Sequence, residues 1–88
     1  MHLENYKHTI FQLCKQHNVR SLYAFGSVLT DKFDDKSDID MIVVFNQMPV
    51  ENYADNYYDL KFTLQDIFNR PVDLLEEQAI KNLYFFRI

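Results

Sequence analysis

LYAFGSVLTDKFDDKSDIDMIVVF, residues Leu22–Phe45, is the stretch that decides the fold. It consists of an apolar run, a Gly-Ser turn, a charged loop, and a second apolar run that two aspartates open. Short apolar runs bounded by turn residues are typical of buried strands. We therefore expect two strands joined by a polar loop at the centre of the fold.

The two aspartates, Asp38 and Asp40, are the candidate metal ligands. They are two positions apart, so on an extended chain both side chains point to the same face. Neighbouring carboxylates repel each other unless a positive charge lies between them, and a divalent cation commonly supplies it. A strand edge with solvated aspartates, or a helix cap at Ser37, would explain the same residues without a ligand. Aspartate is depleted in strands, which favours the metal site.

The single glycine of the chain, Gly26, ends the first apolar run, Val19–Phe25. Glycine is needed where the backbone turns sharply or where a ligand approaches the main chain closely. A simple turn would account for Gly26 alone. Ser27 adds a hydroxyl, and free amides that open a short helix can hold a phosphate. We therefore expect Gly26 and Ser27 to contact phosphate.

Helices are expected on both sides of these strands. Apolar residues recur every three or four positions over Leu3–His17, and again from Tyr53 to near Asn69, which predicts one helix in each segment. Asn18 is the expected stop of the first helix, because Asn tolerates the left-handed conformation that often follows a last turn. Residues 46–52 are expected to form a connection.

A third, short strand is expected at Val72–Leu75, directly after Pro71, because a helix does not readily continue through proline. Asp73 is the one charged residue of this run. It either faces solvent or meets the first two aspartates as a third carboxylate. Glu76 and Glu77 are then expected to open a last helical turn, where the helix dipole favours acidic groups.

Composition limits the class of protein. The 88 residues suffice for one small domain, and a hydrophobic fraction of 48% is that of a globular protein with a core. A formal net charge of −4 argues against direct nucleic-acid binding. The lone cysteine, Cys14, excludes an internal disulfide and is expected to be an inert thiol. No secretion signal or membrane span is visible, so we expect a cytoplasmic protein.

The spacing of these motifs resembles a known family. Gly26-Ser27, ten intervening residues, Asp38-Ile39-Asp40 and a later Asp73 are similar to the signature of the minimal nucleotidyltransferases (MNT, antitoxin type) of the DNA polymerase beta superfamily. The resemblance implies an α/β (α+β) nucleotidyltransferase fold, in which a small mixed sheet packs with two long helices. It also implies a single domain over residues 1–88. Family members usually continue with another helix, so we expect a shortened C-terminus.

The resemblance also implies residue roles. Asp38 and Asp40 would bind the two Mg²⁺ ions that hold the triphosphate, and Gly26 and Ser27 would contact the phosphates of ATP or another NTP. Asp73 would complete the metal site and help to deprotonate the acceptor hydroxyl. Two metal ions can stabilise the attacking and leaving oxygens together. Electrostatic positioning, and not covalent catalysis, would therefore account for the rate.

The resemblance further implies a partner. Small members of the family are commonly antitoxins that transfer AMP from ATP to a tyrosine of a HEPN-domain toxin. Such antitoxins carry an Arg a few positions after the Gly-Ser pair, where this chain has Thr30. The alternative is therefore a catalytically weak binding module that neutralises its partner by contact, with Tyr84–Phe86 as a candidate contact surface. A domain with aspartates but no ligand is a third possibility, and a homo-oligomer is compatible with all three.

Overall fold

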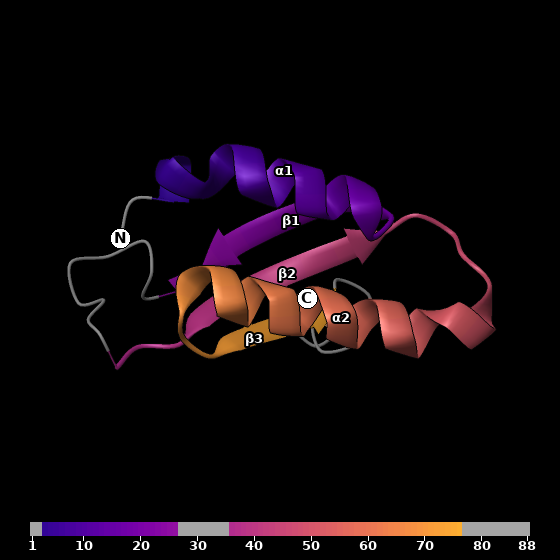
Figure 1. Ribbon diagram of the computed structural model, residues 1–88. Helices are drawn as coiled ribbons and strands as arrows, with labels where there is room; N and C mark the ends of the chain where they lie inside the picture. The colour runs from indigo at the N-terminus through magenta and orange to yellow at the C-terminus, as the bar shows by residue number, and fades with distance from the viewer. Residues whose placement is uncertain (1–2, 27–35, 77–88) are drawn as a thin grey trace, which may run out of the picture.

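The computed structural model describes residues 3–26 and 36–76 (Figure 1). These residues form a three-stranded sheet with two α-helices, one of them preceded by a single 3₁₀ turn. The elements in chain order are η1 (Leu3–Tyr6), α1 (Lys7–Gln16), β1 (Val19–Phe25), β2 (Ile39–Phe45), α2 (Val50–Phe68) and β3 (Val72–Glu76).

The sheet is mixed, with β2 at its centre. The strand order is β1-β2-β3, in which β1 runs antiparallel to β2 and β3 runs parallel to it. Parallel neighbours require a crossover connection, and α2 provides it between β2 and β3. The register pairs Phe25 with Asp40 on one side of β2 and Asp40 with Asp73 on the other. One row of residues across all three strands therefore contains two aspartates.

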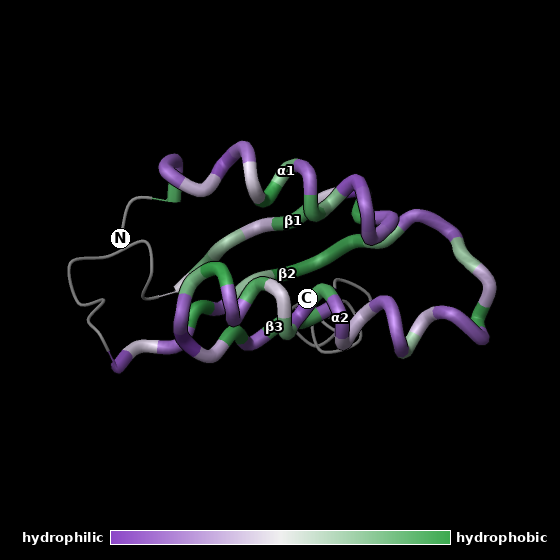
Figure 2. Tube along the Cα trace, in the orientation of Figure 1, coloured by the Kyte–Doolittle hydropathy of each residue, from purple (hydrophilic) through white to green (hydrophobic). Residues whose placement is uncertain are grey.

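Both helices cover the same face of the sheet. The buried core unites alternate residues of β2 and β3 with residues of α1 and α2: Leu13, Ile39, Met41, Val43, Leu60, Leu64, Phe68, Val72 and Leu74. Figure 2 shows β2 as hydrophobic over most of its length, whereas both helices alternate between hydrophilic and hydrophobic residues. Because side chains alternate along a strand, the residues between these core positions point to the opposite face. Asp40 and Asp73 belong to that opposite face.

Both predicted helix stops are confirmed. Asn18 and Asn69, which follow the two helices, have positive φ angles of 58° and 55°. Asn69 is the left-handed C-cap of α2, and its backbone N–H donates to the carbonyl of Gln65. The predicted first helix is in part a 3₁₀ turn, since Leu3–Tyr6 precedes the α-helix proper.

Two predicted boundaries are wrong. The helix α2 begins at Val50, not at Tyr53, directly after Pro49. The apolar spacing missed this first turn because its side chains are exposed. Glu76 does not open a helical turn but ends β3, where the hydroxyl of Tyr53 donates a hydrogen bond to it. Glu77 lies outside the described residues, as does the segment Tyr84–Phe86.

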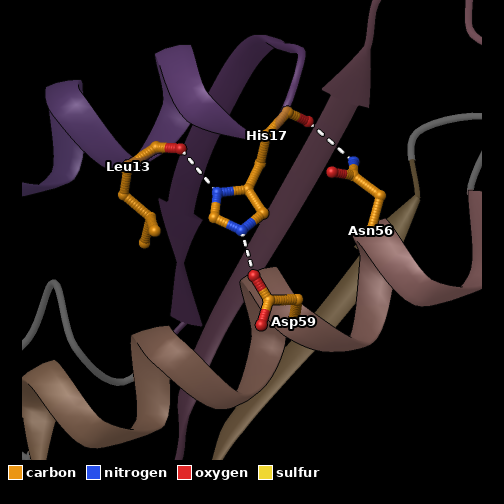
Figure 3. Close-up of polar contacts among 4 residues, drawn as sticks. All are labelled: Leu13, His17, Asn56 and Asp59. Carbon is orange, nitrogen blue, oxygen red and sulfur yellow. Dashed lines mark hydrogen bonds and ion pairs between the residues drawn. The ribbon is translucent and has the colours of Figure 1, made fainter.

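A polar contact joins the C-terminal end of α1 to the middle of α2 (Figure 3). The ring of His17 is buried, and its Nδ1 donates to the carbonyl oxygen of Leu13 at 2.8 Å. Its Nε2 lies 2.5 Å from a carboxylate oxygen of Asp59 in α2, and Asn56 donates to the His17 carbonyl at 2.7 Å. Both ring nitrogens thus face acceptors, which fixes α1 against α2.

A second contact holds α2 to β3. Tyr57 donates through its hydroxyl to the carbonyl oxygen of Leu74, one turn along the helix from the Tyr53 hydroxyl that reaches Glu76. Burial is the main cause that raises the pKa of both phenols, and the nearby charge of Glu76 adds to it.

None of the helices in the described ranges is long and apolar enough to cross a bilayer.

Candidate functional site

Two carboxylates meet on the face of the sheet that the helices do not cover. Asp40 in β2 and Asp73 in β3 are direct partners in the parallel register. Asp40 is half-buried and Asp73 is exposed. Neighbouring strands lie about 4.8 Å apart, so the two side chains are immediate neighbours. Like charges in this position destabilise a sheet, and a cation between them would remove the repulsion. The donor set and its placement therefore fit a divalent cation.

Gly26 lies directly against one of these carboxylates. It follows the last residue of β1, Phe25, which is the antiparallel partner of Asp40. Its φ angle is +78°, a conformation that residues with a side chain rarely adopt. A Cβ atom placed on Gly26 would come within 2.7 Å of Oδ2 of Asp40. The glycine is thus required both by its backbone angle and by the closeness of the Asp40 carboxylate.

Asp38 precedes the strand that was predicted to contain it. β2 begins at Ile39, and Asp38 is an exposed residue just before it. Among the residues that the structure describes, no group of three or more His, Cys, Asp and Glu side chains could hold a metal ion. The structure thus does not bring Asp38 together with Asp40 and Asp73 as one metal-ligand group, and metal binding by the three stays a prediction.

The segment that carries Asp38 is held by the corner between α2 and β3. The backbone N–H of Ile39 donates to the carbonyl oxygen of Pro71 at 3.1 Å, and Arg70 donates through Nη1 to the carbonyl oxygen of Ser37 at 3.4 Å. The side chain of Gln65 in α2 accepts from the N–H of Val72 at 3.1 Å, which fixes the start of β3. The sequence reasoning missed both Arg70 and Gln65.

No pattern in the sequence points to Arg70 or Gln65, because their partners are backbone groups of distant segments. The one available signal was position: Arg70 stands directly before Pro71, in the corner that leads to Asp73. Two other predicted positions cannot be compared with the structure. Ser27 and Thr30 lie outside the described residues, so a phosphate contact at Ser27 stays a prediction.

Comparisons with known proteins agree on one group. The sequence profile of the family described as "Polymerase beta, Nucleotidyltransferase" matches residues 8–88. A proposed protein adenylyltransferase of Methanocaldococcus jannaschii is 36% identical over 72 residues, which are 82% of this chain and 70% of that protein. A solved structure of a proposed minimal nucleotidyltransferase superposes with a TM-score of 0.72 at 25% identity, covering 88% of this chain and 76% of that one. The predicted α+β fold, with a mixed sheet and two helices, is confirmed.

Proposed function

Because the chain belongs to the polymerase beta family of nucleotidyltransferases, we propose that it transfers AMP from ATP to a hydroxyl group. The observation that carries this proposal is the register of Asp40 with Asp73, with Gly26 against the Asp40 carboxylate. Two adjacent carboxylates beside a glycine without a side chain suit a ligand that combines a cation with phosphate groups.

The reaction forms one bond and breaks another at the α-phosphorus of ATP. The acceptor oxygen bonds to that phosphorus, the bond to the bridging oxygen breaks, and pyrophosphate leaves. The acceptor loses its proton, and Asp73 is our candidate to receive it, since it is the exposed member of the carboxylate pair. Gly26 and Ser27 would hold phosphate oxygens through the main chain and the serine hydroxyl.

Mg²⁺ is the cation we propose, held by Asp40 and Asp73 together with Asp38. When bound, it would neutralise charge that develops on the phosphate oxygens. Carboxylate oxygens are the ligands that this hard cation prefers.

We propose that the acceptor is a tyrosine of a HEPN-type partner, which makes this chain the antitoxin of a toxin-antitoxin pair. Support comes from the M. jannaschii relative, whose name describes transfer to a protein, and from the family resemblance.

The test is the double variant Asp38→Asn with Asp40→Asn, which removes two charges and keeps the side-chain shapes. We expect it to lose binding of ATP with Mg²⁺ in calorimetry, and to lose transfer of label from ATP to the product of the neighbouring gene. The matched control is Asp55→Asn with Asp66→Asn, two exposed positions of α2 that should leave both readouts unchanged. Equal nucleotide binding by the two double variants would contradict the proposed site.

The second candidate function is neutralisation by contact alone. It is favoured by Thr30, which stands where the antitoxin members of the family carry an Arg. If the Asp38 and Asp40 variant still neutralises its partner in cells, contact is sufficient. If neutralisation is lost together with label transfer, the chemistry is required.

A further inference from the structure

A groove lies between α1 and the edge of the sheet, away from the carboxylates. Its volume is about 540 Å³, within the range of ligand-binding pockets in proteins. We call it the α1–β1 groove. It is on the helix-covered face of the sheet, opposite to Asp40 and Asp73. Its apolar lining comes from α1 and β1 and includes Ile10, Phe11, Cys14, Val19, Leu22 and Ala24.

The two walls of the groove have matching lengths. On one side, lining residues run along the N-terminal helical segment from Leu3 to Lys15, about 18 Å at 1.5 Å per residue. On the other side, lining residues run along β1 from Val19 to Ala24, about 17 Å at 3.3 Å per residue. In the part of the chain that the structure describes, β1 pairs with β2 alone and forms an edge of the sheet. A groove between a helix and an edge strand can accept an added strand.

The rim of the groove has the opposite charge from the chain as a whole. Lys7, Lys15 and Arg20 line it together with a single acid, Glu4, whereas the formal net charge of the protein is −4. Phe11 on the same rim is 56% exposed, and Nζ of Lys15 lies 4.9 Å from the centre of its ring. An exposed aromatic side chain beside cations is a combination that binding sites for acidic, apolar segments use.

We propose that the α1–β1 groove binds an extended segment of a partner protein, which pairs with β1 as an added strand. The segment is five or six residues long, with apolar side chains at alternate positions that enter the groove and acidic residues that meet the rim. Lys7 and Lys15 are eight residues apart on the helix, or about 12 Å. Acidic residues spaced about four positions apart on a strand span the same distance. This inference is independent of the proposed nucleotidyl transfer.

Selection from a phage-displayed library of random twelve-residue peptides on the immobilised 88-residue protein tests the proposal. We expect enriched peptides in which apolar residues alternate and Asp or Glu recurs about four positions apart. Cys14 provides a second readout, because it is the only cysteine and it lines the groove. An enriched peptide should slow the alkylation of Cys14 by iodoacetamide.

Variants then locate the binding. For an enriched peptide measured by fluorescence anisotropy, Lys15→Glu or Arg20→Glu should weaken binding on the order of fivefold, which corresponds to a surface ion pair. Phe11→Ser should weaken it by about tenfold, as expected for an exposed aromatic side chain that a bound partner would cover. The matched control Lys61→Glu makes the same charge change on α2, and we expect it to leave peptide binding unchanged. All four variants should bind ATP with Mg²⁺ as the parent does, so a failure here is distinct from a failure of the proposed site.

Four results would overturn the proposal. The first is a selection without any enriched sequence, and the second is an enriched peptide that binds the groove variants as well as it binds the parent. The third is an enriched pattern with apolar residues three and four positions apart, because such a peptide binds as a helix. The fourth is a dimer in sedimentation experiments that Lys15→Glu dissociates, because a second copy of the chain would then occupy the groove.

Discussion

Replacing Gly26 with alanine should separate the stability of the fold from the geometry of the site. The φ angle of +78° is available to glycine at no steric cost, whereas it costs an alanine about 1–2 kcal/mol. We expect the free energy of unfolding to fall by that amount. This part of the effect comes from the backbone alone.

The added methyl group should also displace the Asp40 carboxylate. Its Cβ would lie 2.7 Å from Oδ2, and ordinary van der Waals contact begins at 3.4 Å, so the oxygen must move by about 0.7 Å or more. The oxygen is at the end of a side chain, and rotation of Asp40 relieves the clash at little cost in stability. Displacements of this size at a reacting centre lower rates on the order of 10²-fold. We expect a loss of nucleotidyl transfer of that order, together with a lower affinity for ATP with Mg²⁺.

The assay pairs urea denaturation with the transfer of label from ATP and with calorimetric titration of ATP and Mg²⁺, and its control is Asn18→Ala. Asn18 and Gly26 flank the two ends of β1, and both have positive φ angles. Asn18→Ala should therefore cause a similar loss of stability at the end of the strand that is remote from Asp40. The reasoning is refuted if Gly26→Ala keeps the nucleotide affinity of the parent, or if Asn18→Ala loses as much affinity.

Three further predictions concern the carboxylate pair, the helix contact and alkaline pH. Asp73→Asn removes a like charge opposite Asp40, so without Mg²⁺ it should raise the free energy of unfolding by about 0.5 kcal/mol. With Mg²⁺ added, the melting temperature of this variant should no longer rise. Asp59→Ala removes one of the two acceptors of the buried His17 ring, the partner of Nε2, and should cost about 1–3 kcal/mol in urea denaturation. The fold raises the pKa of Tyr53 and Tyr57 above the ordinary value of 10, so it favours their neutral forms. Stability should be full below about pH 10 and fall as pH rises further, and replacing both tyrosines with phenylalanine should flatten that fall.

Each of these predictions has a control and a contradicting outcome. Asp66→Asn removes an exposed charge of α2 and should keep the rise in melting temperature with Mg²⁺. The same rise in Asp73→Asn would contradict the pairing of the Asp40 and Asp73 carboxylates around a cation. His8→Ala changes an exposed histidine and should stay within about 0.5 kcal/mol of the parent; an equal loss in Asp59→Ala and His8→Ala would contradict a specific role for the helix contact. Tyr23→Phe, at a phenol that is 54% exposed, should leave the alkaline profile unchanged. An unaltered profile in the Tyr53 and Tyr57 variant would show that alkaline loss has another cause.

Much of the fold could be predicted from the sequence because it depends on local patterns. Short apolar runs bounded by turn residues identify the strands, and the three-and-four spacing of apolar residues identifies the helices. The left-handed stops at Asn18 and Asn69 follow from the side-chain chemistry of asparagine. The start of α2 at Val50 could not be found in the same way, because the first turn of that helix buries no side chain in the core.

The site was predictable only as a set of residues. Nothing local in the sequence states that Asp73 is the register partner of Asp40, since that pairing depends on where α2 returns the chain to the sheet. The same limit applies to the contact between His17 and Asp59, which are 42 positions apart, and to the donation from Arg70 to Ser37. Gly26 was singled out because a single glycine is expected where the backbone turns sharply or where another group approaches the main chain closely. The fold was needed to show that this group is the carboxylate of Asp40.

The parallel pairing of β2 with β3 also sets the order in which the protein can become active during synthesis. The chain leaves the ribosome from its N-terminus, so β1 and β2 emerge first and can pair as neighbours in sequence. β3 can pair with β2 beside Asp40 only after the nineteen residues of α2 have been synthesised and have folded back onto the sheet. Contacts between distant residues form late because the intervening loop must close first. A partly made chain therefore lacks the second carboxylate, so the proposed nucleotide site is assembled only once β3 has paired with β2.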